Sequence, residues 1–129
     1  MAGRLKGKVA VVTGAAPRGE GVGNGMATAV MFAREGARVV LVNRSAERAD
    51  KLAKQIKDEG GEAAVFAGDV AKADAAEAMA EFAAKKYGRL DILHNNVGIG
   101  APGTPETVTL ADWHKVLEAN LTTTMLCTK

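Results

Sequence analysis

The stretch "KVAVVTGAAPRGEGVGNGMA", residues 8–27, joins a short apolar run to a turn that holds five glycines. The apolar run is typical of a buried strand, and the spacing of the apolar residues after the turn predicts a helix over 24–34. A turn without side chains lets a phosphate approach the backbone, and the helix N-terminus adds free N–H groups and a positive dipole end. The stretch therefore predicts a phosphate-binding strand–turn–helix unit. Because the strict G-x-G-x-x-G string is absent, an ordinary surface loop is the alternative.

The same alternation of apolar runs and amphipathic stretches continues along the chain. Strands are expected within residues 8–14, 37–43, 63–69 and 90–96, and helices over 24–34, 46–59 and 72–87. A last helix is expected to begin after Thr109, which caps it with Asp112 at the third position, and to run to the end of the chain. Continuously apolar strands that alternate with helices indicate a parallel sheet covered on both faces. The predicted fold class is α/β, a Rossmann-like doubly wound parallel sheet.

Composition restricts the class of protein further. A chain of 129 residues predicts one domain, and a net charge of +2 with one Trp, one Tyr and three Phe predicts no nucleic-acid surface. We find no apolar segment long enough for a membrane span and no secretory signal in "MAGRLKGK". Cys127 is the only cysteine, which suggests a reducing compartment and a cytoplasmic location. Two histidines without clustered carboxylates predict no metal site, and His94 is expected to be a core histidine rather than part of a cofactor pocket.

The stretch "VAVVTGAA…GNGMATAVMFAREGARVVLVNRS" resembles the start of the short-chain dehydrogenases/reductases, whose motif is T-G-x-x-x-G-x-G. The matching residues are Thr13-Gly14 and then Gly23-Asn24-Gly25. Eight residues separate Gly14 from Gly23 where the family motif has three, so the turn carries about five extra residues, around 17–22. A second alignment places the later glycines at Gly21-Val22-Gly23.

Three further motifs strengthen the resemblance. "GDV" at 68–70 resembles the family's Asp-Val after the third strand, "NNVG" at 95–98 resembles N-N-A-G, and Asn120 matches the active-site asparagine. The resemblance implies that Asp69 holds the adenine amino group and that Val70 flanks the adenine ring. It also implies cofactor contacts for Asn96, Val97 and Gly98. For Asn120 it implies a catalytic position that supports a helix distortion and a water in the proton path.

The end of the second strand predicts which cofactor is bound. An acidic residue there would bind both ribose hydroxyls and repel a 2′-phosphate, but this chain has Asn43-Arg44. Arg44 can pair bidentately with a 2′-phosphate, and Arg18 in the inserted loop can help from the opposite side. NADP is therefore favoured over NAD. The alternative is that Arg44 is solvent-exposed and Asn43 merely forms a turn, and a solvated position is also expected for Arg48.

The resemblance implies hydride transfer between a nicotinamide and a carbonyl or secondary alcohol, with a Ser and a Tyr-x-x-x-Lys as further catalytic groups. The single tyrosine, Tyr87, is followed by "GRLD", and the single serine, Ser45, is expected to cap a helix. The family's chains are about twice this length. The resemblance also implies the strand order 3-2-1-4. We therefore expect residues 1–129 to be one dinucleotide-binding domain, incomplete at its C-terminus, with the sheet truncated after the fourth strand and the following helix.

On this interpretation the chain is the cofactor-binding half of an oxidoreductase and is inactive alone. Its full-length form is expected to act on a small carbonyl or alcohol and to be a homo-oligomer. Two alternatives remain at this point. The chain is a dinucleotide-binding module without chemistry, or it is an interaction protein that pairs through the open fourth strand and the last helix.

Overall fold

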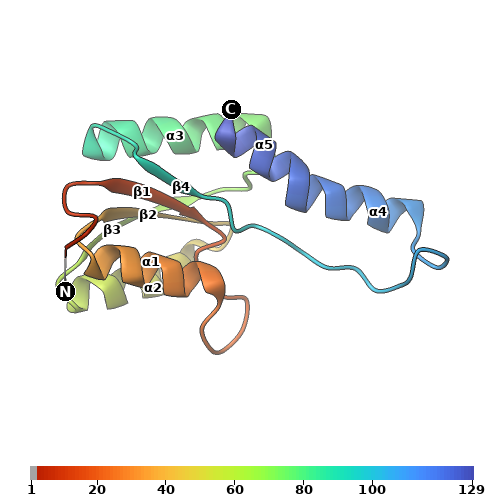
Figure 1. Cartoon of the computed structure of the whole chain (residues 1–129), viewed down its shortest axis with the longest axis horizontal. Helices are drawn as coiled ribbons and strands as arrows, with labels where there is room; N and C mark the ends of the chain where they lie inside the picture. The colour runs from red at the N-terminus through yellow and green to blue at the C-terminus, as the bar shows by residue number, and fades with distance from the viewer. Residues whose placement is uncertain (1–2) are drawn as a thin grey trace.

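The computed structural model describes residues 3–129 as a parallel sheet with helices on both faces (Figure 1). The elements are β1 (Val9–Thr13), α1 (Asn24–Arg34), β2 (Arg38–Asn43), α2 (Ala46–Asp58), β3 (Glu62–Ala67), α3 (Ala73–Tyr87), β4 (Ile92–His94), α4 (Leu110–Leu117), the π-helical turn η1 (Glu118–Thr122) and α5 (Thr123–Thr128). The four strands pair in the order β3-β2-β1-β4. This confirms the predicted α/β, Rossmann-like sheet and its strand order.

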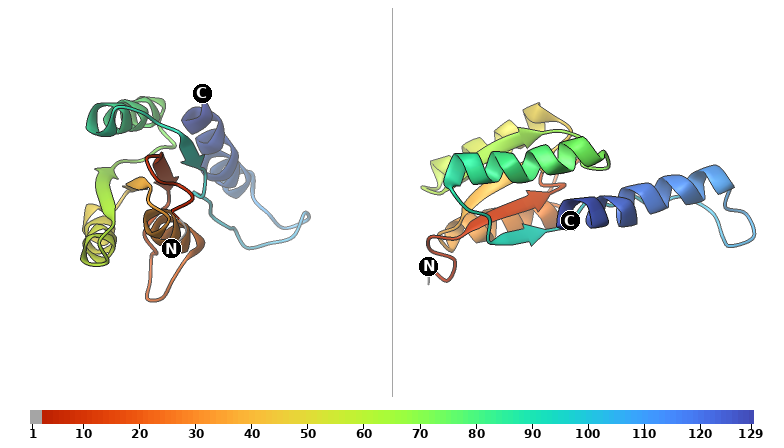
Figure 2. Two further views of the ribbon diagram at one scale, coloured as in Figure 1. Left: turned by 60° about the vertical axis from the view of Figure 1, so that its left-hand side comes forward. Right: turned by 90° about the horizontal axis from the view of Figure 1, so that it is seen from above.

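The sheet separates two hydrophobic clusters. Ala10 and Val12 of β1 face α1 and α2, whereas Val11 faces α3 and the last helix (Figure 2). All five residues of β1 are buried, because the strand lies between β2 and β4 and is covered on both faces. This double coverage explains why the strand is continuously apolar in sequence.

The outer strand β4 is shorter than predicted, because only Ile92–His94 pair with β1. Its approach is fixed by Asp91, whose Oδ2 accepts a 2.8 Å hydrogen bond from the Val9 amide and whose own amide donates to the Val9 carbonyl at 2.9 Å. The Arg89 guanidinium beside Asp91 and the Val9 amide hold the pKa of that carboxyl below its ordinary value. β1 and β4 are therefore anchored at the start of both strands.

The last helix is present as predicted, and it contains a distortion around Asn120, as the resemblance to the family implied. Thr109 caps α4 as expected, since its Oγ1 accepts from the Asp112 amide at 3.1 Å. The helix then widens into the π-helical turn η1 before α5 begins. Thr123 Oγ1 donates to the Glu118 carbonyl, five residues back, at 3.1 Å. One additional residue in a turn leaves no trace in hydrophobic periodicity, so the sequence pattern alone does not reveal it.

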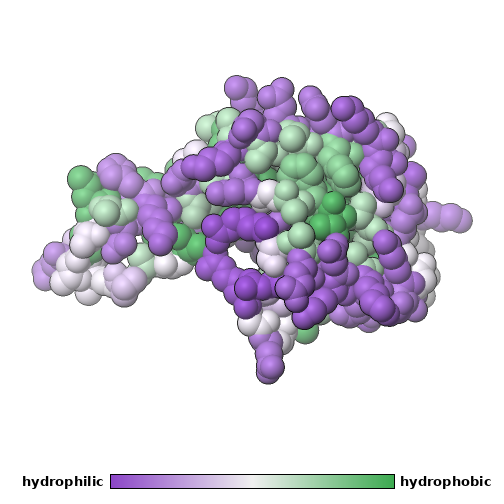
Figure 3. Space-filling view, turned by 180° about the vertical axis from the view of Figure 1, so that it is seen from behind, coloured by the Kyte–Doolittle hydropathy of each residue, from purple (hydrophilic) through white to green (hydrophobic). Residues whose placement is uncertain are grey.

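The segment 99–117, which we call the arm, projects away from the sheet (Figures 1 and 2). Its helix and the turns that follow carry exposed apolar side chains, namely Leu110, Trp113, Leu117, Leu121 and Met125. Figure 3 shows hydrophobic side chains on the arm, at the left of that view. This apolar face lacks a cover within residues 3–129. No helix in this part of the chain has the length and apolar character of a membrane span.

Candidate functional site

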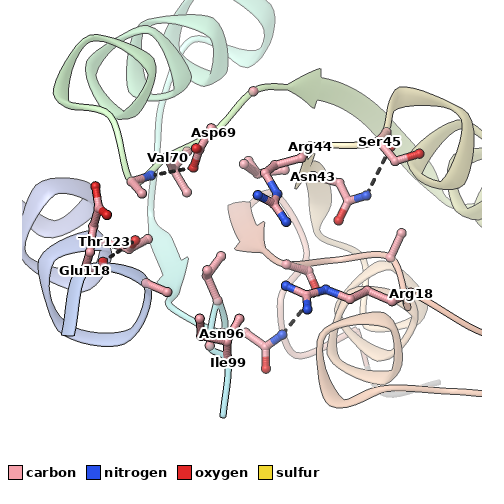
Figure 4. Close-up of a pocket in the computed structure, with 18 of the residues that line it drawn as sticks. Arg18, Asn43, Arg44, Ser45, Asp69, Val70, Asn96, Ile99, Glu118 and Thr123 are labelled. Atoms are coloured by element: carbon pink, nitrogen blue, oxygen red, sulfur yellow. Dashed lines mark hydrogen bonds between the residues drawn. The ribbon is translucent and has the colours of Figure 1, made fainter. Parts of the chain in front are cut away.

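A cleft of about 1140 Å³ opens at the carboxyl ends of the four strands (Figure 4). Each strand contributes the residues that follow it, and the walls include Gly14, Asn43, Arg44, Gly68, Asp69, Val70, Asn96, Val97 and Gly98. Because the chain crosses from one side of β1 to the other between β3 and β4, the strand order reverses beside β1. Ligands of open α/β sheets bind at such a point.

The turns after β1 and β4 are joined by side-chain hydrogen bonds. Thr13 Oγ1 donates to the His94 carbonyl at 3.2 Å and accepts from the Asn96 amide at 3.0 Å. The Asn96 side chain donates to the Gly14 carbonyl at 3.1 Å. Gly14 has a φ of +60°, a conformation that a residue with a Cβ adopts only at a cost. The T-G and N-N motifs thus form one rigid unit beneath the cleft.

The glycines at the start of α1 lie behind this unit rather than in the cleft walls. A Cβ on Gly25 would lie 2.6 Å from Asn96 Nδ2 and would collide with the Gly14 carbonyl, whereas a Cβ on Gly23 would meet open space. Gly23, Asn24 and Gly25 do not line the cleft. The close approach of the helix to the strand at Gly25 favours the alignment Gly23-Asn24-Gly25 over Gly21-Val22-Gly23, since the last glycine of such motifs permits helix–strand packing.

The turns after β2 and β3 form the opposite wall. Asn43 Nδ2 donates to the Ser45 carbonyl at 3.1 Å, and the Gly68 amide donates to the Asn43 carbonyl at 3.1 Å. Ser45 caps α2 by accepting from the Arg48 amide, as predicted. Asp69 Oδ1 accepts from the Ala71 amide at 3.1 Å, so its carboxylate is held at the rim of the cleft.

Three arginines from three different segments line this cleft. They are Arg18 in the inserted loop, Arg44 after β2 and Arg48 in α2. None of them forms an ion pair with a carboxylate within residues 3–129. Figure 4 shows the guanidinium groups of Arg18 and Arg44 extending into the same space. This part of the cleft therefore carries positive charge that no ion pair within residues 3–129 neutralises.

Asn120 lies in η1, outside the cleft walls, and contacts the loop after β4. Its Oδ1 accepts from the Ile99 amide at 2.7 Å, and its Nδ2 donates to the Ile99 carbonyl at 2.9 Å. A Cβ on Gly98 would lie 3.0 Å from Asn120 Oδ1. Both polar atoms of the side chain are therefore engaged in positioning the segment 98–99.

Several residues of the cleft were not predicted from the sequence. Lys72 and Glu118 face each other at 3.8 Å, and Lys115, Ile99 and Gly100 also line the walls. Nothing in the sequence pairs Ile99 with Asn120, because the contact depends on how the arm leaves the sheet. His94 packs against Phe32, with ring centroids 6.4 Å apart, and does not line the cleft. Among residues 3–129 no three His, Cys, Asp or Glu side chains gather in a metal-binding group.

A parallel, doubly wound sheet with a cleft at its carboxyl ends defines the Rossmann-like class of α/β proteins. Residues 8–129 match the family described as short chain dehydrogenase. The chain belongs to this family.

Individual relatives agree with that assignment. The chain is 42% identical over 123 residues to D-threitol dehydrogenase of Mycolicibacterium smegmatis, an alignment that covers 95% of this chain and 45% of the relative. A solved short chain dehydrogenase from Mycobacterium smegmatis superimposes with a TM-score of 0.90 at 37% identity, over 98% of this chain and 51% of the other. A metagenomic short-chain oxidoreductase in complex with NADP gives 0.86 at 38% identity, over 96% and 54%. The chain thus spans about half the length of the curated relatives it matches.

Proposed function

We propose that this chain is the dinucleotide-binding half of an NAD(P)-dependent oxidoreductase that transfers a hydride between a nicotinamide and a carbonyl or secondary alcohol carbon. The observation that carries the proposal is the convergence of the predicted motif residues on one cleft. Nine of the twelve residues predicted from the motifs to contact a cofactor line it, although they come from four separate turns. Membership of the short chain dehydrogenase family supports the same reaction class.

The walls of the cleft fit a dinucleotide in their chemistry. Gly14 presents no side chain, so a diphosphate can approach the backbone there, and α1 directs its N-terminus toward the same turn. Val70 offers an apolar surface, and Asp69 a carboxylate, for an adenine ring and its amino group. When bound, the nicotinamide supplies or accepts the hydride.

We propose a positioning role for Asn120 in the reaction. Its side chain holds Ile99, and its own carbonyl accepts from Thr124 Oγ1 at 3.0 Å, so the residue fixes the loop after β4 against η1. The single tyrosine of this chain supports no catalytic assignment. The Arg38 guanidinium lies over the Tyr87 ring at 5.4 Å, and Arg38 begins β2, at the edge of the sheet opposite the cleft. We therefore propose that residues 1–129 bind the dinucleotide without turnover.

We propose further that the cofactor is NADP rather than NAD. Arg44 and Arg18 extend into one part of the cleft without carboxylate partners, and Asn43 stands where an acid would repel a 2′-phosphate. One structural relative was solved in complex with NADP.

The test is to replace Arg44. Arg44→Ala is expected to weaken NADPH binding by about 1–3 kcal/mol, because a charge-assisted hydrogen bond is lost, and to leave NADH binding nearly unchanged. Isothermal titration of both dinucleotides measures this. Arg4→Ala, which removes an exposed arginine outside the cleft, is the matched control and should change neither affinity. Equal losses for NADPH and NADH in Arg44→Ala would contradict the phosphate contact.

For the full-length form we propose a small carbonyl or alcohol substrate and a homo-oligomeric assembly. The exposed apolar face of α4, with Trp113 54% exposed, supports a partner surface. A size-exclusion profile that depends on protein concentration, with and without NADPH, tests this assembly. NADPH binding by a full-length chain that turns over no carbonyl or alcohol would instead favour the non-catalytic binding module. The cytoplasmic location stays a prediction from the lone cysteine.

A further inference from the structure

The inserted residues 17–22, which we call the strap, connect the turn after β1 to the start of α1. Within residues 3–129 no backbone or side-chain group of the strap takes part in a hydrogen bond, in contrast to the turns after the other three strands. A Cβ added at Gly19 or Gly21 would meet nothing within 4 Å. Residues 18–22 are all exposed. The strap is thus held to the body only at its two ends.

One side chain of the strap nevertheless lines the cleft. The Arg18 guanidinium extends into the space that Arg44 also enters (Figure 4), and Arg48 lines the same cleft. Like charges that enter one space and form no ion pair repel one another, and no hydrogen bond holds the strap in place against that repulsion. A dianion bound between the arginines would attract both guanidinium groups. This attraction would replace the net repulsion and pull the strap toward the cleft.

We propose that the strap is a cover that closes on the phosphorylated ribose of the dinucleotide. Arg18 contacts the 2′-phosphate opposite Arg44, and this contact orders residues 17–22 over the cleft. Closure also allows Val22, which is 71% exposed in the open strap, to bury apolar surface. A dinucleotide without the 2′-phosphate leaves the strap open. This inference rests on the proposed function, since it requires that the cleft bind a dinucleotide.

Limited proteolysis of the 129-residue chain tests the closure directly. The strap contains a trypsin site at Arg18–Gly19 and a glutamyl endopeptidase site at Glu20–Gly21. Saturating NADPH is expected to slow cleavage at both bonds by about tenfold, because cleavage follows the population of the open form. Saturating NADH is expected to leave both rates within about twofold of the free protein.

Two matched variants separate the role of Arg18 from that of the strap as a whole. Arg18→Gln removes the trypsin site but keeps the Glu20 site, at which protection by NADPH should be lost. Glu20→Gln removes the glutamyl endopeptidase site but keeps the Arg18 site, at which protection should remain. Protection that persists in Arg18→Gln, or equal protection by NADH, would overturn the phosphate-driven closure.

The affinity for each dinucleotide is measured separately by titration calorimetry on the same samples. If NADPH binds and the strap is cleaved as fast as in the free protein, the strap inference is wrong and the proposed function stands. If neither dinucleotide binds, the proposed function is wrong. The strap inference is then wrong as well, because it requires a bound dinucleotide. If NADPH binds and protects the Glu20 site only when Arg18 is present, both stand.

Discussion

Two segments that border the cleft, the strap and the segment after β4, are built in opposite ways. The segment after β4 is fixed by five hydrogen bonds, one made by Asn95, two by Asn96 and two by Ile99. The strap between β1 and α1 has none within the described chain. Segments with few hydrogen bonds and high exposure open at little cost in free energy. The cleft therefore combines a preorganised wall with a wall that a ligand can still order.

The sharpest test of the rigid wall is Gly25→Ala. The new Cβ would lie against the Gly14 carbonyl and 2.6 Å from Asn96 Nδ2. Relief requires α1 to shift off β1, so we expect the free energy of unfolding to fall by about 3 kcal/mol. Urea denaturation measures the loss. Gly19→Ala, with open space around its Cβ, should change stability by less than about 0.5 kcal/mol. A neutral Gly25→Ala would mean that the helix does not approach the strand this closely.

Removal of the Asn120 side chain should lower the free energy of unfolding by less than Gly25→Ala does. Asn120→Ala deletes both hydrogen bonds to Ile99 and should lower the free energy of unfolding by about 2 kcal/mol. Asn24→Ala removes an exposed asparagine at the start of α1 and is the matched control, expected to change stability by less than about 0.5 kcal/mol. Thermal unfolding of the two variants in parallel gives the comparison. Similar losses in both variants would show that Asn120 does not hold the loop after β4.

The smallest effect is expected in the strap itself. Gly21 has a φ of +102°, which costs a residue with a Cβ about 1–2 kcal/mol where the backbone is held in place. Because no hydrogen bond holds the strap, Gly21→Ala should relax and lower the free energy of unfolding by less than about 0.5 kcal/mol. Gly14→Ala, at φ +60° and close to Asn96, should lose about 2 kcal/mol by the same denaturation measurement. Equal losses at the two glycines would show that the strap is anchored.

The fold could be predicted from the sequence because its signals are local. The apolar runs that became β1, β2 and β3 each depend on neighbouring residues only. Strand order followed from the resemblance to a known family, and the structure confirms it. The limits of β4 were predicted too wide, because only Ile92–His94 pair with β1, the single neighbour of this strand.

The site could be predicted only in part. Asp69, Arg44 and Gly14 follow strands directly, so the parallel sheet brings them to one edge. The pairing of Asn120 with Ile99 could not be predicted, because it joins a π-helical turn to a loop whose path depends on the arm. That Arg18 and Arg44 would line the same cleft was predicted only from their positive charge. No sequence motif fixes the distance between the two side chains.

The Thr13 hydroxyl affects when the sheet can be completed during synthesis of the chain. It accepts a hydrogen bond from the amide of Asn96, which is 83 residues further along the chain. At a synthesis rate of about 5–20 residues per second, the ribosome makes the second partner roughly 4 to 17 s after the first. During that interval β1 can pair with β2 but has an open side where β4 belongs. During those seconds the unpaired side of β1 is exposed to non-native strand pairing.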